Sequence, residues 1–415
     1  SSDVCSSDLD PAAEAARVVA FEKAFARTFP RRDEMHERQG DKDRVTTQAA
    51  LMKAYPNLAL TEMLDAIPDS TEVRNLFPES FEFLNTALEK ESLETLKSVY
   101  LYHALSSLLV DGYPAFFDRK LAFNNKHLGG PPKLAERNER CTEQVMSGFE
   151  KELDAELVDK LFPNFPKARF NALANQVREA IIRRLEQNTW LSAKGKEGAL
   201  RKMRKARMQL VSPNNDQEWD FIEVATYSPT TPIANSKLRG AKSTAKMLAG
   251  FKTGRDWQRW GMGPLTVNAY YEPSDNKFVM LQGILQYPFF DPGASDVVNL
   301  GAVGVVIGHE LGHGFDNNGS RYNENGVLEA WMPEADAKEF ATRTALLVEQ
   351  FNGYVPASIN PQYGKLTLGE NIADTSGLRF GYEAAFPGGK GTLDDKKAFY
   401  LQYARAWCGD RKSTR

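Results

Sequence analysis

Cysteine and histidine are both scarce in this chain, with three cysteines and five histidines among 415 residues. The low cysteine count excludes a small secreted scaffold held together by disulfides. Apolar runs are short, and none approaches the roughly 18 residues that a membrane-spanning helix requires. The formal net charge is only −3, which argues against nucleic acid as a main partner. The remaining composition is that of a globular chain, long enough for two or three domains.

Two of the five histidines stand four positions apart in His309-Glu310-Leu311-Gly312-His313. Residues four apart lie on one face of a helix, so both imidazoles can reach a single metal ion. Glu310 projects from the adjacent side, where a carboxylate can take a proton from a metal-bound water. The same five letters also occur by chance on surface helices. The apolar run Val305-Val306-Ile307 and the nearby glycines indicate instead a buried helix that departs from ordinary helix propensities, as functional sites often do.

Spacing alone leaves the third metal ligand open. No histidine follows His313, which excludes the downstream-histidine zinc pattern of the metzincins. Glu334 lies one position beyond the thermolysin-like spacing, and the residues around it predict a helix start instead. Glu370 and Asp374 are spaced i, i+4, so one could bind the metal while the other accepts the N–H of a ligand histidine. Thr367 and Glu370 fit a capping box equally well, and the spacing does not decide between these interpretations.

Strand signals concentrate before the histidine motif. Leu265 to Tyr271 and Phe278 to Gln282 are strand-like runs separated by a turn-rich connection, which predicts a hairpin. An edge strand beside a metal could pair with an extended peptide, although a plain structural hairpin fits the same pattern. Helical patterns dominate the earlier part of the chain, including the apolar run from Leu93 to Leu109. The basic run from Lys194 to Arg207 is interpreted as the solvated face of a helix rather than a binding patch.

Three segments, in this order, resemble the neprilysin family of zinc metallopeptidases. They are Val267-Asn268-Ala269-Tyr270-Tyr271, the eleven residues from Val306 to Asp316, and Gly369-Glu370-Asn371-Ile372-Ala373-Asp374. The resemblance implies a mainly α fold with a small β component. This would be a two-domain gluzincin metallopeptidase, with a thermolysin-like catalytic domain and a large helical domain that caps the cleft. We expect the helical domain at residues 10–255 and the catalytic domain at residues 256–408, with some interleaving of the two.

The resemblance also implies how the metal is held. His309, His313 and Glu370 would ligate one zinc ion per chain. Glu310 would act as the general base. Asp374 would orient a ligand histidine.

Substrate contacts are implied in the same way. Asn268 and Ala269 would hold the substrate backbone. The pocket for the residue after the scissile bond would be apolar, although each of its side chains taken alone is better explained as ordinary core. These side chains are Ile284, Phe289, Val305, Val306 and Trp407.

The family also carries an arginine and a histidine beyond a tryptophan-cysteine pair, which Trp407-Cys408 matches here. No histidine follows that pair, and neither Arg411 nor Arg415 stands in the family's motif. We therefore expect a C-terminally truncated catalytic domain that binds zinc but cleaves poorly. Residues 1–9 and 410–415 fit no family pattern, and we expect them to be non-native tails.

The expected function is that of a zinc-dependent endopeptidase, which hydrolyses oligopeptides on the amino side of apolar residues. One alternative is a catalytically silent peptide-binding homologue, which the missing histidine favours. A zinc aminopeptidase would need acidic residues near Asn268, and the sequence has none in a suitable motif. We expect no nucleic acid partner and no membrane span. The low cysteine content fits a bacterial member located in the periplasm or secreted, and leaves open whether Cys141 and Cys408 are bridged.

Overall fold

The structure is a computed structural model that describes residues 10–64, 67–68, 71–112, 114–223, 225–254 and 256–408. The chain forms two compact units, and each unit is assembled from two separate stretches of sequence. The first unit consists of Ser1–Gln144 and Ile222–Asp256. The second consists of Val145–Phe221 and Trp257–Arg415. The predicted tails at 1–9 and 410–415 lie outside the described residues.

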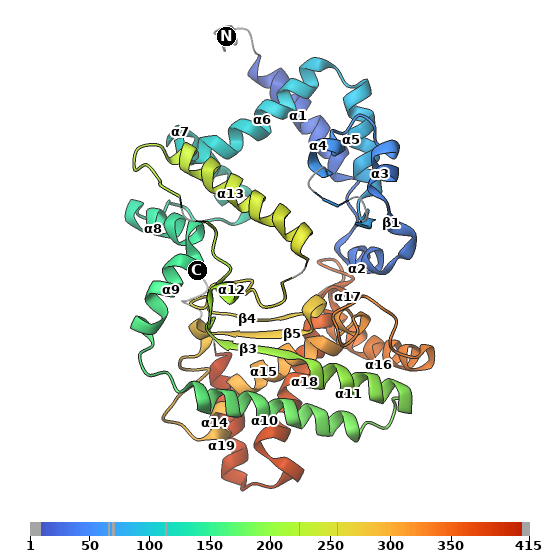
Figure 1. Cartoon of the computed structure of the whole chain (residues 1–415), viewed down its shortest axis with the longest axis vertical. Helices are drawn as coiled ribbons and strands as arrows, with labels where there is room; N and C mark the ends of the chain where they lie inside the picture. The colour runs from blue at the N-terminus through green and yellow to red at the C-terminus, as the bar shows by residue number, and fades with distance from the viewer. Residues whose placement is uncertain are drawn as a thin grey trace. The chain divides into compact units, whose positions relative to one another are not determined.

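The first unit is built almost entirely from helices (Figure 1). Its two short strands, β1 (Val45–Thr46) and β2 (Val73–Arg74), pair antiparallel. The apolar run predicted from Leu93 lies in α6, and a small core forms where Leu51, Tyr55 and Leu60 pack together. The helices of this unit are α1 (Pro11–Ala26), α2 (Arg32–Gly40), α3 (Gln48–Ala54), α4 (Leu60–Leu64), α5 (Pro78–Lys90), α6 (Leu93–Gly112), α7 (Pro114–Leu128), α8 (Arg137–Gly148, which continues into the second unit) and α13 (Pro232–Thr253), with the 3₁₀ turn η1 (Lys42–Arg44).

The second unit combines helices with a three-stranded sheet. Figure 1 shows α10, α15 and α18 together on one side of that sheet. Its helices are α9 (Glu150–Leu161), α10 (Lys167–Glu186), α11 (Ala193–Lys205), α12 (Asp216–Trp219), α14 (Asp296–Gly301), α15 (Val303–Gly312), α16 (Glu334–Asn352), α17 (Tyr363–Leu366), α18 (Leu368–Ala385) and α19 (Leu393–Ala406). Its 3₁₀ turns are η2 (Pro273–Asp275), η3 (Gln282–Ile284), η4 (His313–Phe315), η5 (Gly319–Arg321) and η6 (Pro387–Gly389).

The sheet of the second unit has the strand order β3-β5-β4. The hairpin predicted from the sequence is present: β4 (Ala269–Glu272) pairs antiparallel with β5 (Lys277–Leu281). The third strand, β3 (Arg207–Val211), pairs parallel to β5 and was not predicted. A parallel partner comes from a distant part of the chain, so no local turn signal marks it. β4 is an edge strand of this sheet among the described residues.

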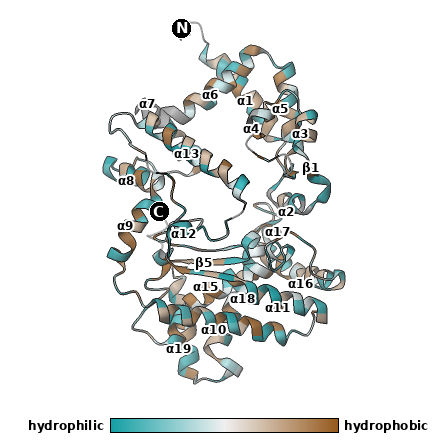
Figure 2. Cartoon of the chain, in the orientation of Figure 1, coloured by the Kyte–Doolittle hydropathy of each residue, from teal (hydrophilic) through white to brown (hydrophobic). Residues whose placement is uncertain are grey.

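The core of the second unit explains why residues 145–221 belong to it rather than to the first unit. Helix α10 buries one apolar side, including Phe170, Leu173 and Val177, each at most 1% exposed. These side chains share one cluster with β5 and α15. Figure 2 shows both brown and teal along α10, as a helix with one buried face should have. The expected division at residue 255 places α10 in the helical domain, whereas the structure places it in the second unit. The reason is that α10 packs against the later segments.

Two further features bear on the predictions. Both Cys141 and Cys408 are exposed and free. No helix among the described residues is both long and apolar enough to cross a membrane.

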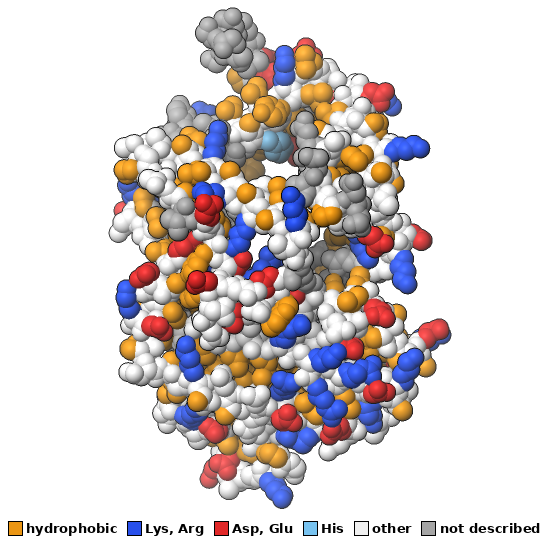
Figure 3. All heavy atoms as spheres, in the orientation of Figure 1, with side chains coloured by type: hydrophobic (Ala, Val, Ile, Leu, Met, Phe, Trp, Pro, Cys, Tyr) orange, Lys and Arg blue, Asp and Glu red, His pale blue; other side chains and the backbone are white. Residues whose placement is uncertain are grey.

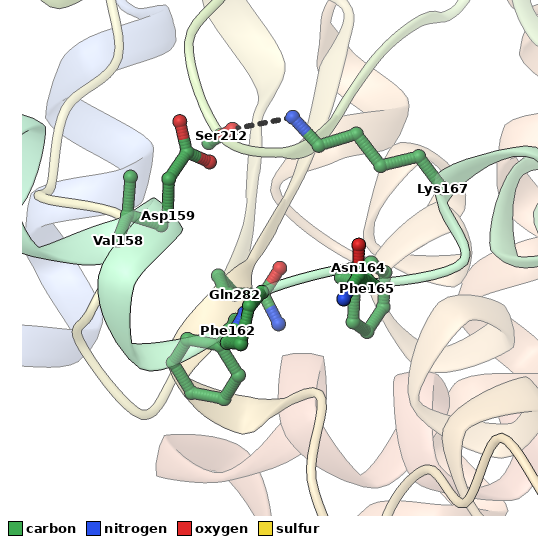
Figure 4. A pocket seen from close by; sticks show the side chains of 9 residues that line it. Val158, Asp159, Phe162, Asn164, Phe165, Lys167, Ser212 and Gln282 are labelled. Atoms are coloured by element: carbon green, nitrogen blue, oxygen red, sulfur yellow. Dashed lines mark hydrogen bonds between the residues drawn. The ribbon is translucent and has the colours of Figure 1, made fainter.

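A cavity of about 320 Å³ lies in the second unit away from the histidine motif, and Figure 4 shows Lys167 at its edge donating to Ser212 Oγ at 3.2 Å. The cavity is lined by Val158, Asp159, Phe162, Pro163, Asn164, Phe165, Lys167, Ser212 and Gln282.

Candidate metal centre

The histidine motif lies on α15, whose residues from Val303 to Gly308 are all buried. The helix ends at Gly312, one residue before the second histidine, but His313 keeps helical backbone angles of φ −58° and ψ −21°. The i, i+4 relation between the histidines is therefore preserved. Their rings stand perpendicular with centroids 4.7 Å apart, and the two Nε2 atoms face each other at 3.1 Å.

Glu370 approaches the same point from α18. Its Oε2 lies 3.4 Å from His309 Nε2 and 3.7 Å from His313 Nε2. The capping box that the sequence left open is not formed, because Thr367 makes no side-chain capping bond. The Thr367 hydroxyl instead donates to Tyr363 O and accepts from Asn371. Among the described residues, His309, His313 and Glu370 form the group of three donors able to hold a metal ion.

The donor set fits zinc. In a tetrahedral site with Zn–N bonds of about 2.0–2.1 Å, the ligand atoms lie roughly 3.3 Å apart. The three observed separations of 3.1, 3.4 and 3.7 Å bracket that value. Two imidazole nitrogens and one carboxylate are also ligands that zinc commonly takes. The residues present can therefore hold a zinc ion with little rearrangement.

Each histidine of the motif has its Nδ1 atom hydrogen-bonded to an aspartate. His309 Nδ1 donates to Asp374 Oδ1 at 2.9 Å, as expected for an acid four residues after Glu370. His313 Nδ1 donates to Asp316 Oδ2 at 2.7 Å, a contact that the sequence reasoning missed. The i, i+3 spacing of His313 and Asp316 was the available signal. A proton held on Nδ1 leaves the Nε2 lone pair free for a metal.

The pKa values of the two histidines respond to these partners. Burial alone would lower the pKa of His309, but hydrogen bonds to Asp374 and Glu370 outweigh it and raise that pKa to about 10. Burial likewise opposes protonation of His313, whose pKa is nevertheless raised by the hydrogen bond to Asp316. The pKa of each imidazole therefore lies above its usual value when no metal is bound.

Glu310 is buried beside the two histidines, with 8% of its surface exposed. Burial raises the pKa of this carboxyl group, while the neighbouring imidazoles act in the opposite direction. The nearby backbone N–H of Tyr271, on edge strand β4, also lowers this pKa slightly. A buried carboxyl group with few neutralising contacts is a costly arrangement, and such groups cluster at functional sites.

Glycine allows the two ligand-bearing helices to approach closely. A Cβ atom on Gly377 of α18 would lie 2.6 Å from His309 N and 2.8 Å from Val305 O. A Cβ atom on Gly308 of α15 would lie 2.9 Å from Gly377 O. Such separations leave no room for a side chain at the crossing. The glycines of this helix thus permit the close packing that brings α18 to the histidines.

The predicted substrate residues lie in two places. Asn268 is exposed directly before β4, and its Oδ1 accepts from Ala269 N at 2.9 Å. Phe289 packs edge-on against Trp407, which is 58% exposed. The other three side chains of the predicted apolar pocket are mostly buried in the main core of this unit. They are Ile284, Val305 and Val306.

Glu334 and the three remaining histidines of the chain lie elsewhere. Glu334 begins α16, as predicted for a helix start, and pairs with Lys338 at 2.8 Å. His103 is exposed and contacts Glu22, and His127 is exposed against an aromatic ring. His36 lies in α2, where its side chain is outside the described part of the structure.

Comparison with known proteins identifies the family. Models of peptidase family M13 match residues 5–213 and 268–415. Human neprilysin is 28% identical over 375 residues, covering 86% of this chain and 50% of neprilysin. The neutral endopeptidase of Lactobacillus helveticus is 30% identical over 287 residues, covering 68% of this chain and 43% of that protein.

Solved structures agree with the sequence relatives. The zinc metalloprotease Zmp1 of Mycobacterium tuberculosis, in complex with an inhibitor, superimposes with a TM-score of 0.83 at 27% identity. That match covers 95% of this chain and 62% of the other. The chain belongs to peptidase family M13, the neprilysin family, as the sequence motifs predicted. It spans about half the length of the curated relatives it matches.

Proposed function

We propose that this chain carries the active site of a zinc-dependent endopeptidase that hydrolyses oligopeptides. The observation that carries the proposal is the convergence of His309, His313 and Glu370 beside the buried Glu310. Membership of a peptidase family supports the reaction class. A single three-donor group among the described residues supports one zinc ion per chain.

The two histidines and Glu370 would hold the zinc ion. When bound, zinc would polarise the scissile carbonyl and lower the pKa of a water molecule. Asp374 and Asp316 keep the protons of the histidines on Nδ1, so that both Nε2 atoms present lone pairs. The side chains of this chain therefore orient both histidines toward the proposed zinc position.

Glu310 would act as the general base. It would accept the proton of the attacking water and then pass it to the leaving amine. Its raised pKa suits a group that takes and returns a proton near neutral pH. The backbone N–H of Tyr271, on β4, lies near this carboxyl group. A protein that only binds peptides has no need of such a buried acid, which disfavours the silent peptide-binding alternative.

The edge strand β4 would hold the substrate. An extended peptide can add to an exposed sheet edge through backbone hydrogen bonds, and Asn268 stands at the start of that edge. The exposed Trp407 beside Phe289 supports a preference for an apolar side chain after the scissile bond. Cleavage on the amino side of apolar residues is therefore the proposed specificity. We further propose a bacterial protein of the periplasm or the exterior.

The test is cleavage of an internally quenched peptide whose amino terminus is acetylated. The zinc-loaded chain should cleave it before an apolar residue, as mass spectrometry of the products would show. The matched variant Glu310→Gln should retain zinc by elemental analysis and lose turnover by about 10² to 10⁴-fold, the usual contribution of a general base.

Three other outcomes would contradict the proposal in different ways. Substantial turnover by Glu310→Gln would remove Glu310 as the base. Cleavage that requires a free amino terminus would indicate an aminopeptidase. Binding of zinc and of peptide without any cleavage would favour the silent homologue.

A further inference from the structure

Lys202 departs from the pattern of the basic run in which it lies. The run was interpreted as a solvated helix face, and Figure 3 shows Lys and Arg side chains gathered over the visible part of α11. That interpretation is wrong for Lys202, which is only 1% exposed. Burying an ammonium group is costly unless strong partners compensate for the lost water. The partners of Lys202 therefore matter.

The ammonium group holds the segment that follows the metal-binding helix. Lys202 Nζ donates to Gly319 O at 2.5 Å and to Tyr322 O at 2.7 Å. The N–H of the same Gly319 donates to Asp316 Oδ1 at 2.6 Å. Asp316 Oδ2 in turn accepts from His313 Nδ1. One glycine thus connects the buried lysine to the carboxylate that orients a metal ligand.

The connection through Gly319 is tight. A Cβ atom at this position would collide with the carbonyl oxygen of His313, so the segment folds directly onto the end of the metal-binding helix. The N–H of Asn318 also donates to Asp316 Oδ1, at 2.7 Å. A displacement of this segment would therefore move the Asp316 carboxylate relative to the imidazole.

Lys202 is itself firmly placed. Asn276 Nδ2 donates to Lys202 O and to Glu324 O, both at 3.0 Å, and Asn276 Oδ1 accepts from the Tyr271 hydroxyl at 2.6 Å. Burial lowers the pKa of Lys202 to about 7, and the buried Asp316 carboxylate partly offsets this. The β4–β5 hairpin, α11 and the segment after α15 are joined at this point.

We propose that Lys202 is a positioning residue of the metal centre, which holds Asp316 and thereby His313 in the geometry that binds zinc. The inference rests on the proposed zinc site. Lys202 Nζ donates to the carbonyl groups of Gly319 and Tyr322, and none of the three proposed metal ligands is among these partners, so its effect must pass through Gly319 and Asp316. A lysine that only stabilised the fold would influence zinc binding no more than any other buried residue of α11.

The test compares Lys202→Met with Met203→Ala in the full 415-residue chain. Methionine keeps the apolar stem and removes the three N–H donors and the charge. Met203 is the adjacent residue, is 2% exposed and belongs to the main core, so its truncation costs stability but keeps Lys202 and its donor group. Zinc affinity would be measured by competition with a chromophoric chelator, and site geometry by the visible spectrum of bound Co²⁺. Thermal unfolding would be followed in parallel.

We expect Lys202→Met to weaken zinc binding by about 10 to 100-fold, as for other residues that orient metal ligands, and to change the Co²⁺ spectrum. Met203→Ala should lower the melting temperature but leave both readouts near those of the parent. Adding Asp316→Asn to Lys202→Met should cost little more than either change alone, because both act on His313 by one route. Fully additive effects would contradict that route.

Two results would overturn the role of Lys202. One is a zinc affinity of Lys202→Met that matches the parent. The other is a loss of zinc affinity in Met203→Ala as large as that in Lys202→Met, when the two variants lose the same stability. If Lys202→Met does not fold, Lys202→Gln carries the test, because its amide keeps the position polar but its shorter chain cannot place N–H groups at both carbonyl oxygens. Folded Lys202→Gln with parent-like affinity and spectrum would likewise overturn the role. Failure of the parent to bind zinc would instead contradict the proposed function itself.

Discussion

The two helices that supply the metal ligands do so from different surroundings. On α15 the side chains of His309 and His313 are 18% and 17% exposed, and Glu310 is buried between them. On α18 the side chains of Glu370 and Asp374 are 67% and 59% exposed. The α15 side holds the two histidines and the buried Glu310 largely away from water, whereas the α18 side offers two carboxylates that water can reach.

The same hydrogen bond to Nδ1 is therefore built in two ways. Asp316 is 7% exposed, comes from the segment that continues α15, and also accepts two backbone N–H groups. Asp374 reaches His309 from another helix and stays exposed to solvent. The α15 side is fixed by local sequence, and the α18 side depends on the close crossing at Gly308 and Gly377. Rigidity before metal binding thus belongs mainly to α15.

The largest losses of zinc affinity should come from two single variants, each of which removes one proposed ligand from one of the two helices. His313→Ala should weaken zinc binding by about 10³-fold, because a preorganised ligand and its second-layer partner are lost together. Glu370→Ala should cost about 10²-fold, because water can replace an exposed carboxylate. Competition titration against a chelator would measure both. Equal losses of zinc affinity in the two variants would show that the α15 and α18 sides of the site do not differ in rigidity.

Glu334→Ala is the matched control for the carboxylate. Glu334 is the acid that stands near the thermolysin-like spacing, but its side chain is 84% exposed at the start of α16. We expect its replacement to leave zinc affinity unchanged. A greater loss in Glu334→Ala than in Glu370→Ala would reassign the third ligand.

The α15 side of the site was largely predictable from sequence, and the α18 side was predictable only with the family resemblance. His309, Glu310 and His313 follow from helical spacing alone. Glu370 fitted a ligand and a capping box equally well until the packing against α15 excluded the capping box. Asp316 could have been found from its spacing to His313, with which it forms a hydrogen bond.

Apart from some expected interleaving of the two domains, the sequence reasoning identified no long-range packing. The parallel strand β3 has no local signal that pairs it with β5. Lys202 looked like one more solvated cation, although it lies 117 positions from the Gly319 carbonyl that it binds. Residues 145–221 belong to the second unit for the same reason, because they pack against segments that lie much later in the chain. In each case the determining contact joins segments that are far apart in the chain.

A smaller effect should separate the two aspartates. Asp316→Asn should weaken zinc binding by up to about 100-fold, because the amide nitrogen would face the Nδ1–H in a buried site. Asp374→Asn should cost only about tenfold, because water can solvate the exposed position. The measurement is the same competition titration, with unfolding temperatures recorded to detect loss of the fold. A larger loss in Asp374→Asn would show that α18, not α15, carries the rigid half of the site.

The pH dependence of zinc binding should amount to about tenfold per pH unit, the effect of displacing a single proton. In the metal-free chain the pKa of His309 is about 10, and the facing Nε2 atoms at 3.1 Å share one proton, since two N–H groups cannot point at each other. Zinc must displace that proton, so apparent affinity should rise between about pH 7 and 9 and level off near the pKa. Asp374→Asn removes a partner that raises this pKa, so the affinity of this variant should level off at a lower pH than that of the parent. A zinc affinity of the parent that does not depend on pH would show that the two histidines share no proton. Calorimetric titration in two buffers of different ionisation enthalpy would count the protons released on zinc binding directly.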